Sequence, residues 1–204
     1  AGAVRGADEA RFMRTNSEAV ERLVRCAVQQ SCVQRFLLIS SLAASKPSVS
    51  PYAASKRGGE NALASVASGM ICMALRPPAV YGPGDRELLP LFTAMARGFA
   101  PLWGGSDTRF SLIFIDDLVA AVVQWVASAK PVSGVFELHD GRSDGYSMSE
   151  VIDIAAEVFD RRIRTIRIPA QVLKIAAAVN TRLARVVGYE PMLTPWKLNE
   201  LREP

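Results

Sequence analysis

The sequence contains a single histidine, His139, and only three cysteines among its 204 residues. One imidazole cannot build a histidine-based zinc site, and it argues against a Ser-His-Asp triad. Cys26, Cys32 and Cys72 are odd in number, match no metal motif and lie in apolar stretches. We therefore expect buried free thiols in a reducing cytoplasm, without a disulfide, and we expect no metal site.

Long apolar runs and clustered basic residues are also lacking. No stretch approaches the ~18 uncharged apolar residues that a membrane span needs, and the first residues lack the pattern of a signal peptide. The net charge is only 24 − 20 = +4. No group of Lys and Arg is interleaved with aromatic residues, which argues against nucleic-acid binding. Half of the residues are hydrophobic, as in a globular protein.

What is present is a regular alternation of helical and strand-like segments. Apolar runs predict buried strands at 33–40, 70–75, 111–115 and 135–138, and a half-exposed strand at 163–168. Apolar stripes and capping residues predict helices at 8–30, 50–68, 88–97, 118–129, 147–159 and 169–187, and a short one from 194. The alternation predicts the α/β class, with a doubly wound parallel sheet and a small C-terminal α/β lobe.

One pair of residues indicates proton-transfer chemistry. Tyr52 and Lys56 stand four residues apart in an expected helix, so they lie one turn apart on one face. A phenol normally titrates near pH ~10, and a neighbouring ammonium lowers that pKa toward the range of a useful base. Ser41 ends the apolar run that begins at Phe36, so its hydroxyl could meet Tyr52 above the sheet.

These residues occur in order with two further motifs. Residues 75–85 read LRPPAVYGPGD, and residues 114–118 read FIDDL. In this combination the sequence resembles the extended short-chain dehydrogenase/reductases, the NAD-dependent epimerase/dehydratase family, over nearly the whole chain. The resemblance implies a Rossmann-like NAD(P)-binding domain over residues 1–80 and a mainly substrate-binding lobe over residues 81–204. Segments near 110–130 would return to the main sheet.

The resemblance also implies roles for the motif residues. Tyr52 would be the acid/base, and Lys56 its electrostatic partner and a ligand of the nicotinamide ribose. Ser41 would orient the substrate oxygen, with Ser40 as the alternative, because the short loop before Tyr52 leaves the register open. The implied cofactor is NAD or NADP.

Further cofactor contacts are implied at five positions. Ala1 and Gly2 match the family's Ala-Gly at the end of its fourth strand, which lies against the cofactor. Asn16 matches a cofactor-contacting asparagine, although an exposed helix asparagine is the alternative. Pro78 falls where the family closes over the nicotinamide, and Ser40 lies at the strand end beside it.

Three further residues are expected on the substrate side, besides Ser41. Ala79 stands where the family frequently has Asn, and this difference weakens a nucleotide-sugar assignment. Arg86 and Arg109 could grip a substrate phosphate in a bidentate manner, and solvated loop arginines are the alternative.

One family element is missing. The family opens with a Gly-rich turn that cradles the dinucleotide pyrophosphate, whereas Gly2 and Gly6 have neither its spacing nor a preceding strand. The resemblance therefore implies that roughly 60–80 residues of the first mononucleotide-binding half are lacking. We expect the chain to be the C-terminal part of a longer enzyme, and the choice between NAD and NADP stays open.

The expected function is an NAD(P)-dependent oxidoreductase or epimerase acting at a hydroxyl or carbonyl carbon. A nucleotide sugar, a steroid-like alcohol and a small ketone all fit as substrate. The alternative is a non-catalytic dinucleotide-binding scaffold or accessory subunit. Expected partners are a small-molecule substrate and, as an open option, a second copy of the chain, in the cytoplasm. We interpret the helix at 169–187 as a lobe helix, with docking to a membrane surface or partner as the alternative.

Because the adenine and pyrophosphate contacts would be missing, we expect these 204 residues alone to bind NAD or NADP weakly or not at all. Isothermal titration calorimetry on the isolated chain measures this binding directly. A dissociation constant in the micromolar range would contradict the expectation.

Overall fold

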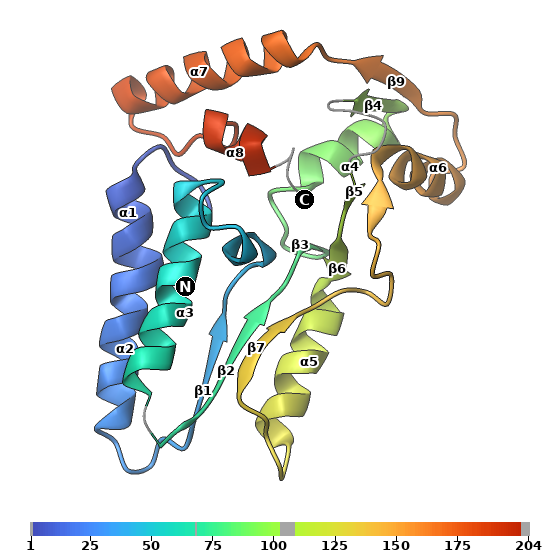
Figure 1. The fold of residues 1–204 in the computed structure, drawn as a ribbon. Coiled ribbons are helices and arrows are strands. Elements are labelled where there is room, and N and C mark those ends of the chain that lie inside the picture. The colour runs from blue at the N-terminus through green and yellow to red at the C-terminus, as the bar shows by residue number, and fades with distance from the viewer. Residues whose placement is uncertain (1, 68, 103–108, 201–204) are drawn as a thin grey trace. The chain divides into compact units, whose positions relative to one another are not determined.

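Three parallel strands form the main sheet in the computed structural model, which describes residues 2–67, 69–102 and 109–200. They are β1 (Arg35–Ile39), β2 (Ile71–Arg76) and β7 (Gly134–Glu137), in the order β1-β2-β7 (Figure 1). Leu37 lies opposite Met73, and Leu75 lies opposite Phe136. Because all three strands run the same way, their carboxyl ends meet at one edge of the sheet.

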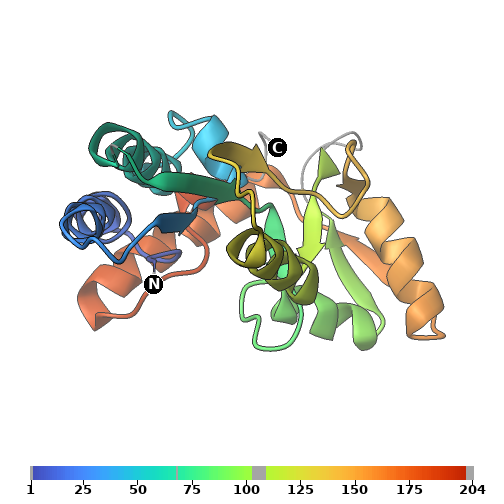
Figure 2. The ribbon, with the colours of Figure 1, turned by 90° about the horizontal axis from the view of Figure 1, so that it is seen from below.

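Helices cover both faces of this sheet, as the doubly wound fold class predicts (Figures 1 and 2). Val24 of α2 (Ala19–Val28) and Leu63 of α3 (Pro51–Val66) pack on one face, against Ala74. Trp125 of α5 (Ile115–Ala127) packs on the other face, with Met73 and Leu75. Consecutive side chains of β2 therefore point to opposite faces and are buried on both, which explains its uninterrupted apolar sequence.

The chain divides into two units. Unit 1 comprises Ala1–Pro78 and Asp116–Leu138, and it contains the main sheet. Unit 2 comprises Ala79–Ile115 and His139–Pro204. The chain thus leaves unit 1 directly after the Arg76-Pro77-Pro78 sequence and re-enters it at the start of α5.

The described residues of unit 2 form short strand pairs and four helices. The strands β3 (Ala79–Tyr81) and β6 (Leu112–Phe114) pair in parallel, as do β4 (Phe99–Leu102) and β9 (Arg164–Arg167), whereas β5 (Arg109–Phe110) and β8 (Tyr146–Ser147) are antiparallel. The helices are α4 (Leu89–Ala96), α6 (Met148–Val158), α7 (Ala170–Val187) and α8 (Pro195–Glu200). Its core is formed by Met95, Ala100, Leu112, Val151, Ile152 and Ala155.

The helix expected at 8–30 contains an irregular turn. Asp8 caps α1 (Glu9–Met13) by accepting a hydrogen bond from Ala10 N at 3.0 Å. A π-helical turn, η1 (Arg14–Glu18), then leads into α2 without a break. Asn16 lies in the middle of this turn and is buried. Such π-turns often occur at functional sites, because they change the direction of side chains on one helical face.

The expected burial of the thiols is wrong for two of the three cysteines. Cys26 and Cys32 are exposed, and Cys72 is half-buried. In α2 it is Val24 that faces the sheet and is fully buried, so Cys26 lies off the buried stripe. Within the described residues, no helix is long and apolar enough to cross a membrane.

Helix α3 passes very close to the π-turn. A Cβ atom built on Gly59 would lie 2.5 Å from the carbonyl oxygen of Asn16, which is backbone and cannot move aside. A Cβ atom on Gly58 would meet the Ser17 hydroxyl at 2.6 Å, which can rotate away, and Ser17 Cβ at 3.1 Å, which must give way by a few tenths of an ångström. Gly59 therefore sets the distance between α3 and η1.

We predict that Gly59→Ala lowers the free energy of unfolding by about 1–3 kcal/mol, because the added methyl group forces two backbones apart. The matched variant Gly58→Ala should cost less, because Ser17 can change its rotamer and alanine favours the helix. Chemical denaturation of both variants measures the difference. Equal destabilisation by the two substitutions would contradict the close approach.

Candidate functional site

The side chain of Lys56 lies at the carboxyl end of β1. Its Nζ donates a hydrogen bond to the carbonyl oxygen of Ile39, the last residue of that strand, at 3.0 Å. The same Nζ lies 5.9 Å from the centre of the Tyr52 ring. Helix α3 begins one residue before Tyr52, at Pro51, and Ser50 caps it by accepting from Ala53 N at 3.0 Å. The cap therefore fixes the helical register that brings Tyr52 and Lys56 to the strand end.

Burial and a neighbouring carboxylate act in opposite directions on Lys56. Burial disfavours the charged amine and holds the pKa of Lys56 below its ordinary value, while the negative charge of Glu60 opposes this shift. Glu60 follows Lys56 by one helical turn. Without Glu60, the ammonium at this position would lose its proton more readily.

The ring of Tyr52 is held from the neighbouring helix. It packs edge-on against Phe12 of α1, with ring centres 5.9 Å apart. Phe12 is buried, which fixes the side of α3 on which the phenol stands. An edge-to-face pair of this kind is worth about 0.5–1.5 kcal/mol beyond the burial of its surface.

The two serines after β1 make different contacts. The Ser40 hydroxyl is buried and donates to Glu60 Oε1. The Ser41 oxygen accepts from Ala43 N at 3.3 Å and caps η2 (Leu42–Ser45), a short 3-10 helix. Because an acceptor contact leaves the hydroxyl proton of Ser41 unused, Ser41 rather than Ser40 retains a donor for a ligand.

A buried ion pair lies behind these serines. Arg76, at the end of β2, donates to both carboxylate oxygens of Glu60, from Nε at 2.9 Å and from a terminal nitrogen at 2.7 Å. Its other terminal nitrogen donates to Glu137, at the end of β7, at 3.1 Å. Together with the bond from Ser40, the Glu60 carboxylate and Arg76 tie α3 to the carboxyl ends of all three strands.

The pKa of Glu60 reflects this arrangement. Burial alone would raise it, but hydrogen bonds from Arg76 and Ser40 and the charges of Arg76 and Arg57 outweigh burial and lower the pKa below its ordinary value. Sequence analysis did not single out Glu60 or Arg76 as a pair. The available signal was the position of Glu60 one turn after Lys56, and of Arg76 within the motif at 75–85.

The side chain of Asn16 connects the N-terminal segment, at Ala3, with helix α3 by hydrogen bonds. Its Oδ1 accepts from Ala3 N, and its Nδ2 donates to Ala3 O, both at 2.9 Å. Nδ2 also donates to the hydroxyl of Ser55 at 3.0 Å. Ser55 stands between Tyr52 and Lys56 in the sequence. Both amide protons are therefore used, and one lone pair of Oδ1 is what Asn16 retains for a ligand. Its cofactor contact stays a prediction.

The residues around Lys56 fit a nicotinamide cofactor. An ammonium has three protons, and the Ile39 carbonyl takes one of them. A Cβ atom on Gly2 would lie 3.6 Å from Lys56 Nζ and 3.4 Å from Asn16 Oδ1, so a glycine keeps the space beside the ammonium free of a side chain. A ribose with two hydroxyls suits such a donor.

The remaining implied residues are spread over both units. Pro78 is half-buried at the end of unit 1, Ala79 and Arg86 are exposed in unit 2, and Ala1 lies outside the described residues. The contacts of Pro78, Ala79 and Arg86 with a cofactor or substrate therefore stay predictions.

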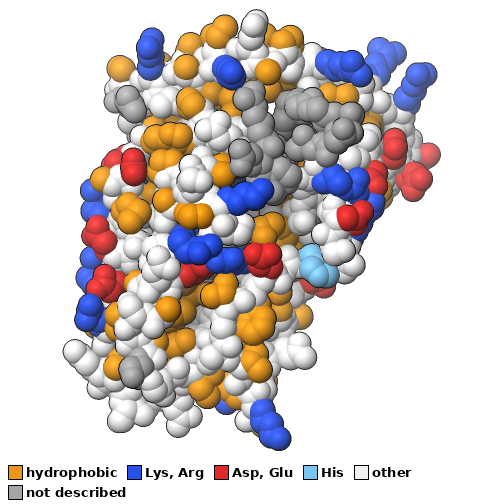
Figure 3. Space-filling view, viewed as in Figure 1, with side chains coloured by type: hydrophobic (Ala, Val, Ile, Leu, Met, Phe, Trp, Pro, Cys, Tyr) orange, Lys and Arg blue, Asp and Glu red, His pale blue; other side chains and the backbone are white. Residues whose placement is uncertain are grey.

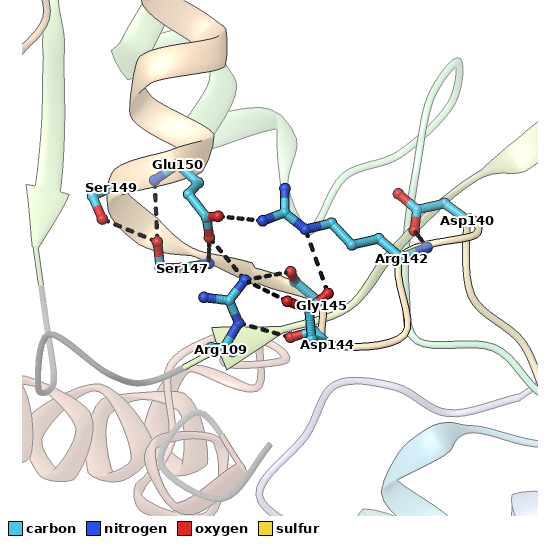
Figure 4. A network of polar contacts seen from close by, with 8 residues as sticks. All are labelled: Arg109, Asp140, Arg142, Asp144, Gly145, Ser147, Ser149 and Glu150. Carbon is cyan, nitrogen blue, oxygen red and sulfur yellow. Dashed lines mark hydrogen bonds and ion pairs between the residues drawn. The ribbon is translucent and has the colours of Figure 1, made fainter.

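Arg109 lies within a polar network of unit 2 (Figure 4). Its guanidinium donates to Asp144 O at 2.7 Å and Gly145 O at 2.9 Å, and it pairs with Glu150 at 3.0 Å. Glu150 also pairs with Arg142. Hydrogen bonds from the backbone and hydroxyl of Ser147, together with the two arginines, lower the pKa of Glu150 to about 2 against burial. Arg109 is thus already neutralised by carboxylates.

Known proteins resemble this chain in sequence and in fold. A model of the NAD dependent epimerase/dehydratase family matches residues 2–138. Ceramide reductase from Caulobacter vibrioides is 39% identical over 168 residues, which are 82% of this chain and 51% of that protein. The mitochondrial NADH dehydrogenase (ubiquinone) 1 alpha subcomplex subunit 9 of Arabidopsis thaliana is 27% identical over 190 residues, which are 92% of this chain and 46% of that protein.

A solved structure shares the fold. UDP-glucose 4-epimerase from Thermotoga maritima superimposes with a TM-score of 0.69 at 23% identity, over 83% of this chain and 62% of that one. The chain spans about half the length of the curated relatives it matches. The family match covers all of unit 1 except Ala1, including its parallel sheet and the motif residues Ser41, Tyr52 and Lys56. It confirms the resemblance drawn from those motifs, and a nicotinamide cofactor is the cofactor of this family. The chain belongs to the NAD dependent epimerase/dehydratase family.

Proposed function

We propose that this chain carries the catalytic residues of an NAD(P)-dependent oxidoreductase that interconverts a hydroxyl and a carbonyl carbon. One observation carries the proposal. The Lys56 ammonium lies at the end of β1, where it donates to Ile39 O at 3.0 Å and lies 5.9 Å from the centre of the Tyr52 ring. Ser41 follows Ile39 by two residues. These groups belong to one unit, so they share a single local geometry.

Tyr52 would exchange a proton with the substrate oxygen. The positive charge of Lys56 stabilises a phenolate and so lowers the free energy of proton release from Tyr52. Glu60 helps to keep that charge, because it opposes the loss of the Lys56 proton that burial promotes. The phenol and the ammonium thus form a proton donor and acceptor that functions near neutral pH.

Ser41 would hold the same substrate oxygen by donating its hydroxyl proton. Its oxygen is already fixed by the bond from Ala43 N, which orients the side chain. Lys56 would also bind the ribose of the cofactor, beside Gly2. When bound, the nicotinamide supplies the hydride chemistry.

For the substrate we propose a ketone or secondary alcohol without a required phosphate. Two observations support this choice. Arg109, one of the two arginines expected to grip phosphate, is paired with Glu150 and Asp144. The chain is also more similar in sequence to a ceramide reductase, at 39% identity, than to the nucleotide-sugar epimerase, at 23%. We further propose a cytoplasmic location.

The second candidate function is a dinucleotide-binding subunit without turnover. The 27% identity to a subunit of mitochondrial NADH dehydrogenase favours it. Purified full-length protein incubated with NADH or NADPH and a panel of long-chain ketones and sugar nucleotides separates the candidates. Oxidation of the cofactor with a ketone supports the reductase, whereas bound cofactor without turnover of any substrate supports the subunit.

Substitution of the motif residues tests their roles. We predict that Tyr52→Phe lowers kcat about 100- to 10,000-fold, because proton transfer loses its donor. Lys56→Met should lower kcat and also raise the dissociation constant of the cofactor, measured by quenching of tryptophan fluorescence.

The matched controls remove the same groups elsewhere. Tyr189→Phe deletes a phenolic hydroxyl in unit 2, and Lys130→Met deletes an exposed ammonium, so both should retain activity. A Tyr52→Phe variant with the turnover of the Tyr189→Phe variant would contradict the assignment.

Glu60→Gln tests the ion pair behind the site. We predict that it lowers the free energy of unfolding at neutral pH on the order of 3 kcal/mol, because Arg76 loses its buried, doubly bonded partner and keeps only the single bond to the exposed Glu137. Since folding lowers the pKa of Glu60, its contribution is complete above about pH 4.3 and is lost as pH falls through the folded-state pKa. The stabilities of wild type and variant should therefore converge in acid, as urea denaturation at several pH values would show.

An exposed ion pair provides the control. Glu21 and Arg25 pair on the surface of α2, so Glu21→Gln should cost at most about 0.5 kcal/mol. A constant stability difference between wild type and Glu60→Gln from neutral pH to acid would rule out the predicted contribution of the carboxylate.

A further inference from the structure

The segment that contains β9 and α7 has an unusual charge. Between Arg161 and Tyr189 the sequence has seven Lys and Arg residues and no Asp or Glu. The rest of the chain contains 24 − 7 = 17 basic and 20 acidic residues, a net charge of −3. The positive net charge of the protein therefore resides entirely in this segment.

Helix α7 has one face that packs within unit 2. Ala177 and Ala184 are buried, and Asn180 donates to Leu193 O at 2.9 Å in the connection to α8. These residues recur at intervals of three and four, so they lie on one side of the helix. This side is occupied by the protein itself.

A second face of α7 is apolar and exposed. Its side chains are between 52% and 85% exposed and are spaced by three or four residues: Val172, Ile175, Val179, Leu183 and Val186. Five large aliphatic side chains in one row along an 18-residue helix are more than the scattered exposed residues of an ordinary surface. The row indicates a surface that is covered when the protein functions.

Basic residues lie beside the apolar row. Lys174 and Arg182 are exposed and eight residues apart, so they lie on one adjoining face of the helix. Arg164 and Arg167 of the preceding strand are exposed as well. In Figure 3, hydrophobic and basic side chains gather along α7. The combination of an apolar face, a basic face and no acidic residue is typical of helices that lie in a membrane interface.

We propose that α7 docks the protein on an anionic membrane surface. The apolar row from Val172 to Val186 would enter the boundary between headgroups and acyl chains, and Lys174 and Arg182 would contact anionic headgroups. The charge favours this occupant, because an anionic lipid surface complements a segment with seven cations and no anion. A protein partner or another part of a longer chain would also cover apolar side chains, and the test distinguishes these occupants. The proposal is independent of the catalytic function.

Co-sedimentation of the full-length protein with lipid vesicles tests the proposal. We expect binding to vesicles of phosphatidylcholine with phosphatidylglycerol, little binding to phosphatidylcholine alone, and weaker binding as salt rises. Lys174→Gln and Arg182→Gln should each weaken binding about fivefold. Ile175→Ser combined with Val179→Ser should weaken it at least about tenfold.

Matched controls place the same changes on other helices. Val119→Ser with Val123→Ser removes two equally exposed valines of α5, and Arg22→Gln removes an exposed cation of α2, so all should bind vesicles like wild type. Circular dichroism checks that each variant is folded. If the double variant unfolds, Val186→Ser replaces it in the binding test, because Val186 is the most exposed residue of the apolar row.

Three results would overturn the proposal. One is the absence of binding to anionic vesicles, and another is equal binding by the α7 and control variants. The third is a change in melting temperature or oligomeric state of the α7 variants with unchanged vesicle binding, which would show that a protein surface covers this face.

Discussion

The Glu60 carboxylate is the interaction on which the arrangement of unit 1 depends. It receives two bonds from Arg76 at the end of β2 and one from Ser40 after β1, while Arg76 reaches Glu137 at the end of β7. A carboxylate buried to this extent is stable only because every oxygen is bonded and a guanidinium neutralises it. The site is thus assembled around a charge whose removal would leave Arg76 with only its single bond to the exposed Glu137.

This ion pair links the fold to the chemistry. Glu60 and Lys56 stand on the same face of α3, so the anion that holds the strand ends also helps to keep the ammonium charged. The ammonium in turn donates to the Ile39 carbonyl and lies 5.9 Å from the centre of the Tyr52 ring. The close packing of Gly59 on Asn16 and the bonds of Asn16 to Ala3 place the N-terminal segment at the same strand end. Stability and proton transfer consequently share one set of contacts.

Local sequence patterns predicted the parts of this structure that depend on neighbours in the chain. The four-residue spacing of Tyr52 and Lys56 follows from helical geometry, and both residues lie in α3 with the Lys56 ammonium near the Tyr52 ring. Contacts between distant segments were not predictable in this way. Glu60 and Arg76 meet because α3 crosses β2, and the apolar run at 111–115 gave no indication that it would pair with β3. The ion pairs of Arg109 with Asp144 and Glu150 likewise depend on how the loop before α6 folds.

The central claim is that Lys56 is a half-buried ammonium whose charge Glu60 supports. Nuclear magnetic resonance of the side-chain amines measures it, because the chain has only five lysines and Lys56→Met assigns the signal. The account predicts that Lys56 titrates below the other lysines in the wild type, and lower still in Glu60→Gln. A Lys56 that titrates with the other four lysines, and is unaffected by Glu60→Gln, would contradict it.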